Sequence, residues 1–149
     1  MKNELTVLHQ LKDVIENNLN DYLAAGLTPI TSDNVLLKFP NPDDMPKRVM
    51  FYIVPDWAEY ENLATTNDSV EFHVTIFILC KRAKHIILEE EVYGYYNALY
   101  ELLRRDMTLG SYVDFTEIDS AYFYSAVDAS ETVTGTEVAV TINYTKDFE

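Results

Sequence analysis

The stretch from Ser69 to Cys80, SVEFHVTIFILC, constrains the fold more than any other part of the chain. Apolar and polar residues alternate at its start, and an apolar run follows at its end. Alternation with a period of two is typical of a strand with one buried face, whereas an apolar run is typical of a strand covered on both faces. A long helical pattern comes next, so the sequence predicts a central strand that leads into a crossover helix.

Two segments have the spacing of amphipathic helices. Apolar residues at three- and four-residue intervals predict an N-terminal helix over Glu4–Ala25, and a second apolar stripe runs from Leu88 to Leu103. Asn3 can cap the start of the first helix, and Gly26 can end it in the left-handed conformation.

Four further strands are predicted from local alternation and turn residues, at Val35–Phe39, Arg48–Val54, Ile118–Asp128 and Glu137–Thr145. Pro55 is expected to end the second of them, and Gly135 to mark a hairpin turn before the last. The chain therefore predicts one α+β domain, residues 1–149, with a mainly antiparallel four- to five-stranded sheet packed against an N-terminal helix and a crossover helix.

The charge balance excludes one large class of function. The formal net charge is −14, and the part of the chain from Met107 onward has eight acidic residues against one lysine. Tight nucleic-acid binding depends on neutralising phosphates, so a direct DNA or RNA binder is not expected. The basic residues form three short clusters, Lys47–Arg48, Lys81–Arg82–Lys84 and Arg104–Arg105. Faces of opposite sign would suit head-to-tail contacts between identical subunits, although a mixed solvated surface explains each cluster as well.

No motif for catalysis, cofactor binding or metal binding is found. The histidines lack ligand spacing, the glycines form no phosphate-binding loop, and the single cysteine, Cys80, lies in the most apolar strand, where a small core residue is expected. The glutamates at 89–91 match the dipole at the start of the second helix. The N-terminus has neither a signal-peptide core nor a membrane span. We therefore expect a protein that is not an enzyme and that needs no cofactor or metal.

Three groups of residues are candidate contacts for other subunits or partners. The first is a long acidic loop predicted over Asp56–Asp68, in which Trp57, Tyr60 and Leu63 are residue types suited to interfaces; folding back onto the sheet is the alternative. The second is the basic patch Lys81, Arg82 and Lys84, for which plain solvation is the alternative. The third is a tyrosine flank on the second helix, Tyr93, Tyr96 and Tyr100, which would pack either against the first helix or against another subunit.

The order of these elements resembles that of a bacteriophage family. The segments with the likeness are RVMFYIV, SVEFHVTIFILCKR, EEEVYGYYNALYELLRRD and SAYFYSAVDASETVTGTEVAVTINYTKD. Over nearly the whole chain, the sequence resembles the tail terminator or tail-completion proteins of long-tailed phages, also called head–tail joining proteins.

The resemblance implies a structural protein of the virion tail and neck, assembled in the host cytoplasm. Its subunits would form a homo-oligomeric ring, usually of six, on the tail tube protein, end the polymerisation of the tube, and offer a surface to the head connector or stopper protein. Genome DNA would pass through the lumen without specific binding, and no membrane or cofactor is involved. No binding residue can be transferred by motif.

Other functions fit the same sequence. A head-completion protein or a tail-tube subunit would share the structural class, although a tube protein polymerises openly where a terminator closes a ring. An acidic inhibitor or DNA mimic would bind a basic partner as a monomer or dimer. A small α+β enzyme would require a cleft with two facing carboxylates.

Overall fold

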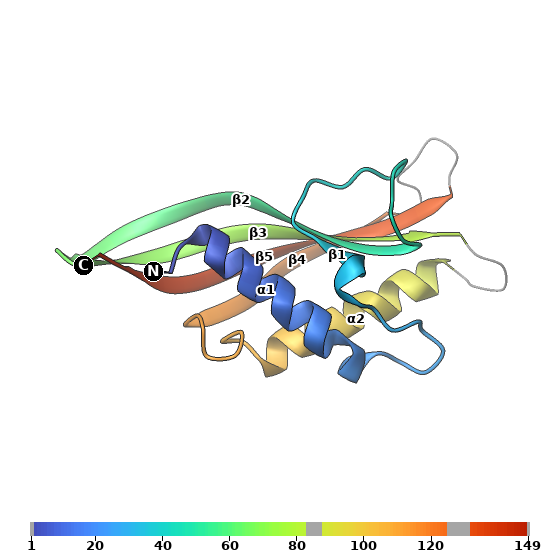
Figure 1. Cartoon of the computed structure of the whole chain (residues 1–149), viewed down its shortest axis with the longest axis horizontal. Helices are drawn as coiled ribbons and strands as arrows, with labels where there is room; N and C mark the ends of the chain where they lie inside the picture. Colours follow the sequence, from blue (N-terminus) through green and yellow to red (C-terminus); the bar gives the residue numbers. More distant parts are fainter. Residues whose placement is uncertain (1, 83–87, 125–131, 149) are drawn as a thin grey trace.

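The computed structural model describes residues 2–82, 88–124 and 132–148 as an α+β fold (Figure 1). Its helices are α1, Glu4–Asn18, and α2, Leu88–Arg105, with short 3₁₀ turns η1, Leu19–Tyr22, and η2, Ser32–Asn34. Its strands are β1, Val35–Leu36; β2, Val49–Ala64; β3, Asn67–Lys81; β4, Phe115–Tyr124; and β5, Val133–Asp147. The predicted fold class is confirmed.

The five strands form one sheet in the order β1-β2-β3-β5-β4. All neighbours are antiparallel except β1, which pairs in parallel with β2 through only Phe51 and Tyr52. Since β3 and β4 are both antiparallel to β5, they run in the same direction, and α2 is the crossover between them. The predicted passage from the central strand into a crossover helix is therefore confirmed.

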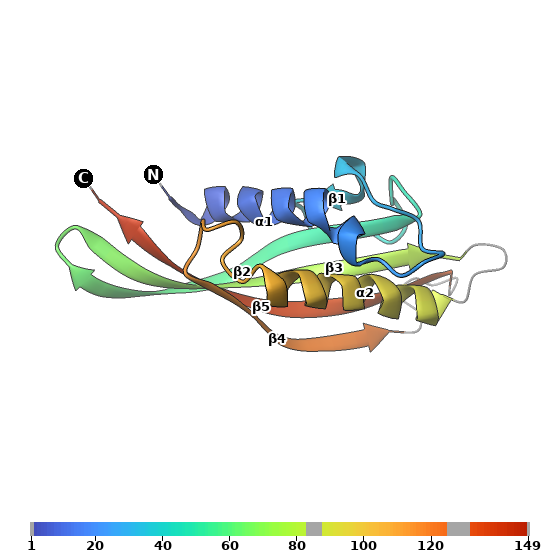
Figure 2. The ribbon, with the colours of Figure 1, turned by 90° about the horizontal axis from the view of Figure 1, so that it is seen from below.

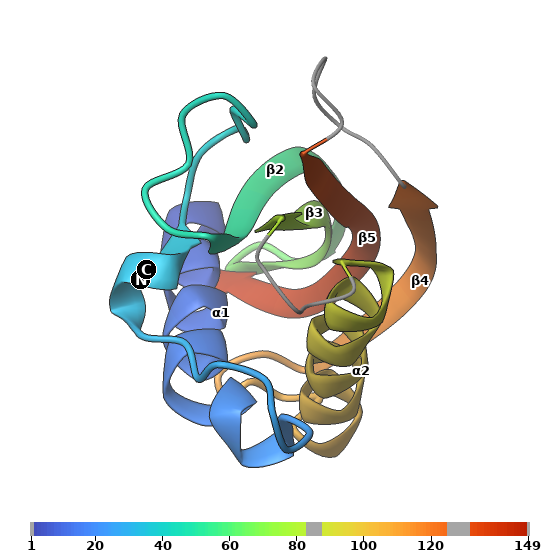
Figure 3. The same cartoon turned by 90° about the vertical axis from the view of Figure 1, so that its right-hand side faces the viewer.

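Both helices cover the same face of a strongly twisted sheet (Figures 2 and 3). One core joins them to this face, which we call the helix face. Its strand residues alternate in sequence as the pattern predicts, and include Val70, Phe72, Val74, Ile76 and Ile78 of β3. Cys80, fully buried at the end of this row, is the core residue that was expected. A smaller apolar cluster containing Met50 and Tyr52 lies on the opposite face, which we call the open face.

Helix α1 begins as predicted but ends earlier. Asn3 forms a capping box with Thr6, in which each side chain accepts from the backbone N–H of the other residue at 2.9 Å. The α-helix ends at Asn18 and continues only as the 3₁₀ turn η1, so the predicted end at Ala25 is wrong. Gly26 nevertheless has the expected left-handed conformation, with φ of 95°.

The largest difference from the sequence prediction is in β2. Residues 56–64 form no loop, because β2 continues through Pro55 to Ala64 and pairs with β3 along its length. Pro55 lacks an N–H, but β1 occupies the outer edge of β2 only at Phe51 and Tyr52, so no ladder bond is lost there. A bulge follows between Pro55 and Trp57. The turn that joins β2 to β3 is reduced to Thr65 and Thr66.

Three other element boundaries differ. Gly135 does not form the turn, since it lies within β5 between Leu79 of β3 and Tyr124 of β4. A Cβ at this position would lie 2.5 Å from Leu79 Cδ2 and 2.9 Å from the Ile78 carbonyl oxygen, so close strand packing explains the glycine. The predicted edge strand near Val35 is only two residues long. Strand β4 starts at Phe115, before the predicted start, and its predicted end at Asp128 lies outside the described residues.

Within the described part of the chain, neither helix has the combination of length and apolar character that crossing a membrane requires.

Candidate subunit and partner interface

The extended part of the β2–β3 hairpin, residues 55–74, forms an arm at the end of the molecule where both termini lie (Figures 1 and 2). It contains five acidic residues and no lysine or arginine. The bulge after Pro55 shifts the alternation, so Trp57 lies opposite His73 on the open face and Tyr60 lies opposite Val70 on the helix face. The arm therefore presents different aromatic residues on its two faces.

Trp57 is held flat against the sheet but remains half exposed. Its ring stacks on the His73 imidazole with centroids 3.8 Å apart and planes 13° apart, and 52% of the residue is accessible. Glu59 and Glu61 follow on the same face, opposite Glu71 and Ser69. This face of the arm therefore combines one exposed aromatic ring with adjacent carboxylates.

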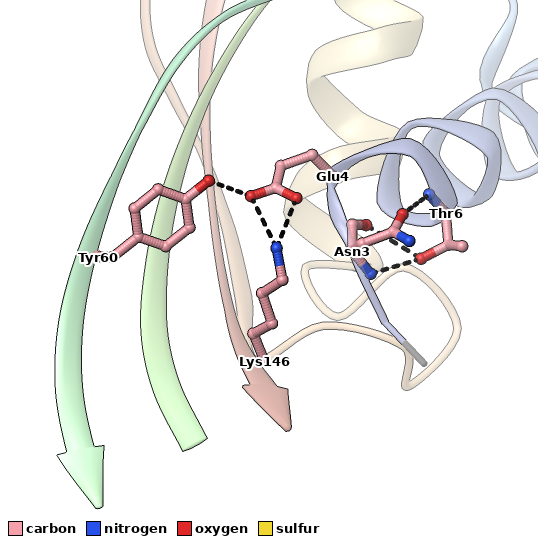
Figure 4. A network of polar contacts seen from close by, with 5 residues as sticks. All are labelled: Asn3, Glu4, Thr6, Tyr60 and Lys146. Carbon is pink, nitrogen blue, oxygen red and sulfur yellow. Dashed lines mark hydrogen bonds and ion pairs between the residues drawn. The ribbon is translucent and has the colours of Figure 1, made fainter. Parts of the chain in front are cut away.

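A polar network links the other face of the arm to the start of α1 (Figure 4). The Tyr60 hydroxyl donates to Glu4, and Lys146 Nζ lies 3.1 Å from Glu4 Oε2. Burial alone would raise the pKa of Glu4, but hydrogen bonds from Tyr60, the backbone and Lys146 together hold that pKa below its usual value. The same bond raises the pKa of Tyr60. The ionised Glu4 carboxylate thus connects α1, β2 and β5.

His73 itself belongs to a small network on the open face. The Thr141 hydroxyl donates to Asp119 Oδ2 at 2.5 Å, so it accepts from His73 Nδ1 at 3.1 Å. His73 Nε2 has no hydrogen-bond partner among the described residues, although Glu71 Oε2 lies 3.7 Å away. Trp57 covers one face of the His73 ring.

The tyrosine flank of α2 packs on β4. Tyr93 stacks on Phe123 with ring centroids 4.4 Å apart. Tyr96 packs edge to face on Phe123 with a centroid distance of 5.2 Å, and its ring also lies 6.2 Å from that of Tyr100. These ring contacts show that Phe123 of β4 covers part of the flank, whereas the sequence predicted the first helix or another subunit as its cover. Tyr93 and Tyr100 remain 48% and 46% exposed.

The basic candidates lie at the opposite end of the sheet from the arm. Lys81 ends β3 and Arg82 follows it, beside Arg48 at the start of β2, because the two strands are antiparallel. Lys81 Nζ contacts the Met45 carbonyl oxygen at 3.4 Å, whereas the Arg82 side chain is exposed. Lys84 lies outside the described residues.

Arg48 is not available as a surface cation. Its guanidinium forms a bidentate pair with Glu91 of α2, at 2.7 and 2.5 Å, and also donates to the Lys81 carbonyl oxygen at 2.9 Å. Glu91 is only 2% exposed, so a residue that the sequence explained by the helix dipole alone is a buried ion-pair partner. The hydrogen bonds that Arg48 donates to Glu91 raise the pKa of the Arg48 guanidinium.

Burial dominates the remaining titratable groups near this pair. Desolvation raises the pKa of the Cys80 thiol and raises that of Tyr95 to about 12, so both remain neutral at physiological pH. The Tyr95 hydroxyl donates to the Thr28 carbonyl oxygen at 2.6 Å. A cavity of about 260 Å³ lies beside Tyr95, lined also by Thr28, Lys47 and Arg48.

The described residues contain no group of three or more His, Cys, Asp or Glu side chains arranged to hold a metal ion. A second hollow on the arm is lined by the acidic residues Glu59, Glu61 and Glu71 together with Tyr60, Ser69 and Asn143. The arrangement suits contact with a positively charged protein group.

Trp57, Tyr60 and Leu63, which the sequence groups as candidate contacts, are all more than half exposed on the arm. Sequence reasoning placed them in a loop and gave no indication that Trp57 and Tyr60 point to opposite faces. It missed Phe123, as well as the exposed Tyr122 and Tyr124 of β4. The run of three aromatic residues at Tyr122–Tyr124 was the available signal, because side chains that alternate along a strand place aromatic rings on both of its faces.

Comparisons with known proteins give a structural match. No family model matches the chain, and no curated protein matches it. Among solved structures, the fold is similar to that of the PVC sheath/tube terminator in the extended state, from a cryo-EM study of an extracellular contractile injection system. The match covers 99% of this chain with a TM-score of 0.54 and 9% sequence identity. The chain spans 58% of the length of that protein. It therefore has a terminator-like fold.

Proposed function

We propose that this protein is a tail terminator, a structural subunit that caps the tube of a phage tail or of a related injection device. The observation that carries the proposal is the fold shared with a sheath/tube terminator over 99% of the chain. The protein would stop polymerisation of the tube by occupying its end, and would give the next component, in a phage the head connector, a surface to bind.

A capping role needs contact surfaces in place of a reactive centre, and we propose that the protein is not an enzyme. The half-exposed side chains of the arm supply one such surface, and the aromatic flank of α2 supplies another. A ring of six copies, as the resemblance to the phage family implies, would leave a lumen for the genome. With a net charge of −14 per subunit, acids in the lumen would repel DNA and limit its sticking during passage.

The proposal is tested by locating the protein on assembled particles. Particles would be purified from the organism that encodes the chain, with the protein tagged after its last residue, and labelled with gold for electron microscopy. A terminator gives label at one end of each tube. Label along the whole tube would identify a tube protein, and no label on particles would favour an acidic inhibitor of a basic partner.

Native mass spectrometry of the purified protein gives an independent readout. A terminator is expected to form a closed oligomer of fixed copy number, whereas a tube protein adds copies without limit. A broad series of increasing oligomers would contradict the capping role.

A further inference from the structure

Two charged surfaces lie at opposite ends of the same sheet and have no partners within the described chain. On the open face of the arm, the side chains of Glu59 and Glu61 are exposed, and neither carboxylate forms a hydrogen bond or ion pair with a described residue. The only lysine at this end of β5, Lys146, is held by Glu4 on the other side of the arm. The arm carboxylates are therefore uncompensated.

At the other end of the sheet, two cationic side chains likewise have no ion-pair partner among the described residues. Lys47 precedes β2 and Arg82 follows β3, and the side chains of both are exposed and form no ion pair with a described residue. Arg48, between them, is neutralised by Glu91. The available positive charge at this end therefore comes from Lys47 and Arg82, with Lys81 beside them.

We infer that the acidic open face of the arm binds the Lys47–Arg82 end of a second copy of this chain. The inference rests on the proposed function, because it specifies how the subunits of the terminator ring contact one another. Each subunit contributes its arm to one neighbour and its basic end to the other, which is a head-to-tail contact that a ring can close.

The chemistry of the arm suits an arginine in particular. One face of the Trp57 ring is covered by His73, and the residue is still 52% accessible. A guanidinium can stack on such a ring and donate at the same time to a neighbouring carboxylate, and Glu59 follows Trp57 on the same face at a spacing of roughly 7 Å. Arg82 can satisfy both contacts, with Lys47 close enough to pair with a further carboxylate.

The test uses two charge-reversed variants of the full chain. The arm variant is Glu59→Lys/Glu61→Lys, and the end variant is Lys47→Glu/Arg82→Glu. All four side chains are exposed, so circular dichroism is expected to show an unchanged fold for both variants. Copy number is measured by native mass spectrometry, and association by sedimentation velocity in 0.15 M salt.

Each variant alone is expected to associate at least roughly 100-fold more weakly than the wild type, because like charges then face each other. An equimolar mixture of the two is expected to recover the oligomer, in an even-numbered ring that contains the variants in alternation. The matched control Asp13→Lys/Asp21→Lys changes the net charge by the same amount as the arm variant at exposed positions on α1 and η1, and is expected to assemble normally.

The inference is overturned if the wild type is monomeric, if either variant assembles like the wild type, or if the mixture fails to recover the oligomer. Should one variant fail to fold, the other alone still tests the contact from its own side. These results are separate from the gold-labelling experiment. If gold labels one end of each tube but both variants assemble like the wild type, the capping role stands and only this subunit contact is rejected.

Discussion

The two halves of β2 pair with the same strand but lie in opposite environments. Every residue of Val49–Ile53 is buried, whereas every residue of Pro55–Ala64 is exposed except the half-buried Ala58. Both halves pair with β3, so backbone hydrogen bonding does not distinguish them. The difference shows that one continuous strand can contribute its first half to the core and leave its second half free to bind partners.

The largest expected effect compares one aromatic residue from each half. Phe51→Ala removes a fully buried ring from the core and is expected to lower the free energy of unfolding by about 3–5 kcal/mol. Trp57→Ala is expected to cost about 1 kcal/mol or less, because only the stack on His73 is lost. Urea denaturation of both variants at a concentration where the protein is monomeric measures the difference. Equal losses would mean that the arm belongs to the core.

Removing the cation of the buried ion pair should have the next largest effect. Arg48→Ala leaves Glu91 buried without its partner and is expected to cost about 3 kcal/mol in the free energy of unfolding. Lys47→Ala is the neighbouring control on an exposed side chain and should change stability by no more than about 0.5 kcal/mol. If the two variants unfold at the same urea concentration, the pair contributes nothing to the fold.

Close strand packing in the body of the sheet predicts an intermediate effect. Gly135→Ala would place a Cβ against the Ile78 carbonyl oxygen, which cannot move without disturbing β3, so we expect a loss of about 1–3 kcal/mol. Thermal unfolding measures this loss. Had Gly135 been in an exposed turn, as the sequence suggested, alanine would leave the melting temperature nearly unchanged.

The sequence predicted the buried half of the molecule well because burial determines residue type there. The alternation in β3 and β5, the crossover helix and the Asn3 cap each follow from a local physical requirement. The second half of β2 escaped prediction because its residues are mostly exposed, so burial does not determine residue type there. Pro55 then appeared to end the strand, although an unpaired edge tolerates proline.

The candidate site was predictable only in part. Interface-type residues such as Trp57 could be recognised by type, since tryptophan and tyrosine are enriched at interface hot spots. Their faces could not be predicted, because a one-residue bulge exchanges the two sides of a strand. The Arg48–Glu91 pair joins residues 43 positions apart, and nothing in the local pattern of either one indicates the other.

The smallest predicted effect concerns the anchoring of the arm to α1. Glu4→Gln removes the charge that accepts from Tyr60 and pairs with Lys146, and should cost about 1 kcal/mol or less while increasing hydrogen exchange in the arm. Asp13→Asn, an exposed change on the same helix, is the control.

The pH dependence of this effect follows from the lowered pKa of Glu4. A carboxylate with a depressed folded-state pKa stabilises the fold above its unfolded value, near 4.5, and loses that contribution as the pH falls through the folded value. The difference in arm protection between wild type and Glu4→Gln should therefore be full at pH 7 and vanish in acid. A difference that persists at pH 2 would show that the charge of Glu4 is not the cause.

The central claim is tested most directly by measuring tube lengths in electron micrographs after deletion of this protein. In the organism that encodes the chain, loss of a terminator predicts tubes of abnormal and broadly distributed length, and complementation with the wild-type chain should restore one length. Tubes of normal, uniform length in the deletion strain would contradict the terminator function.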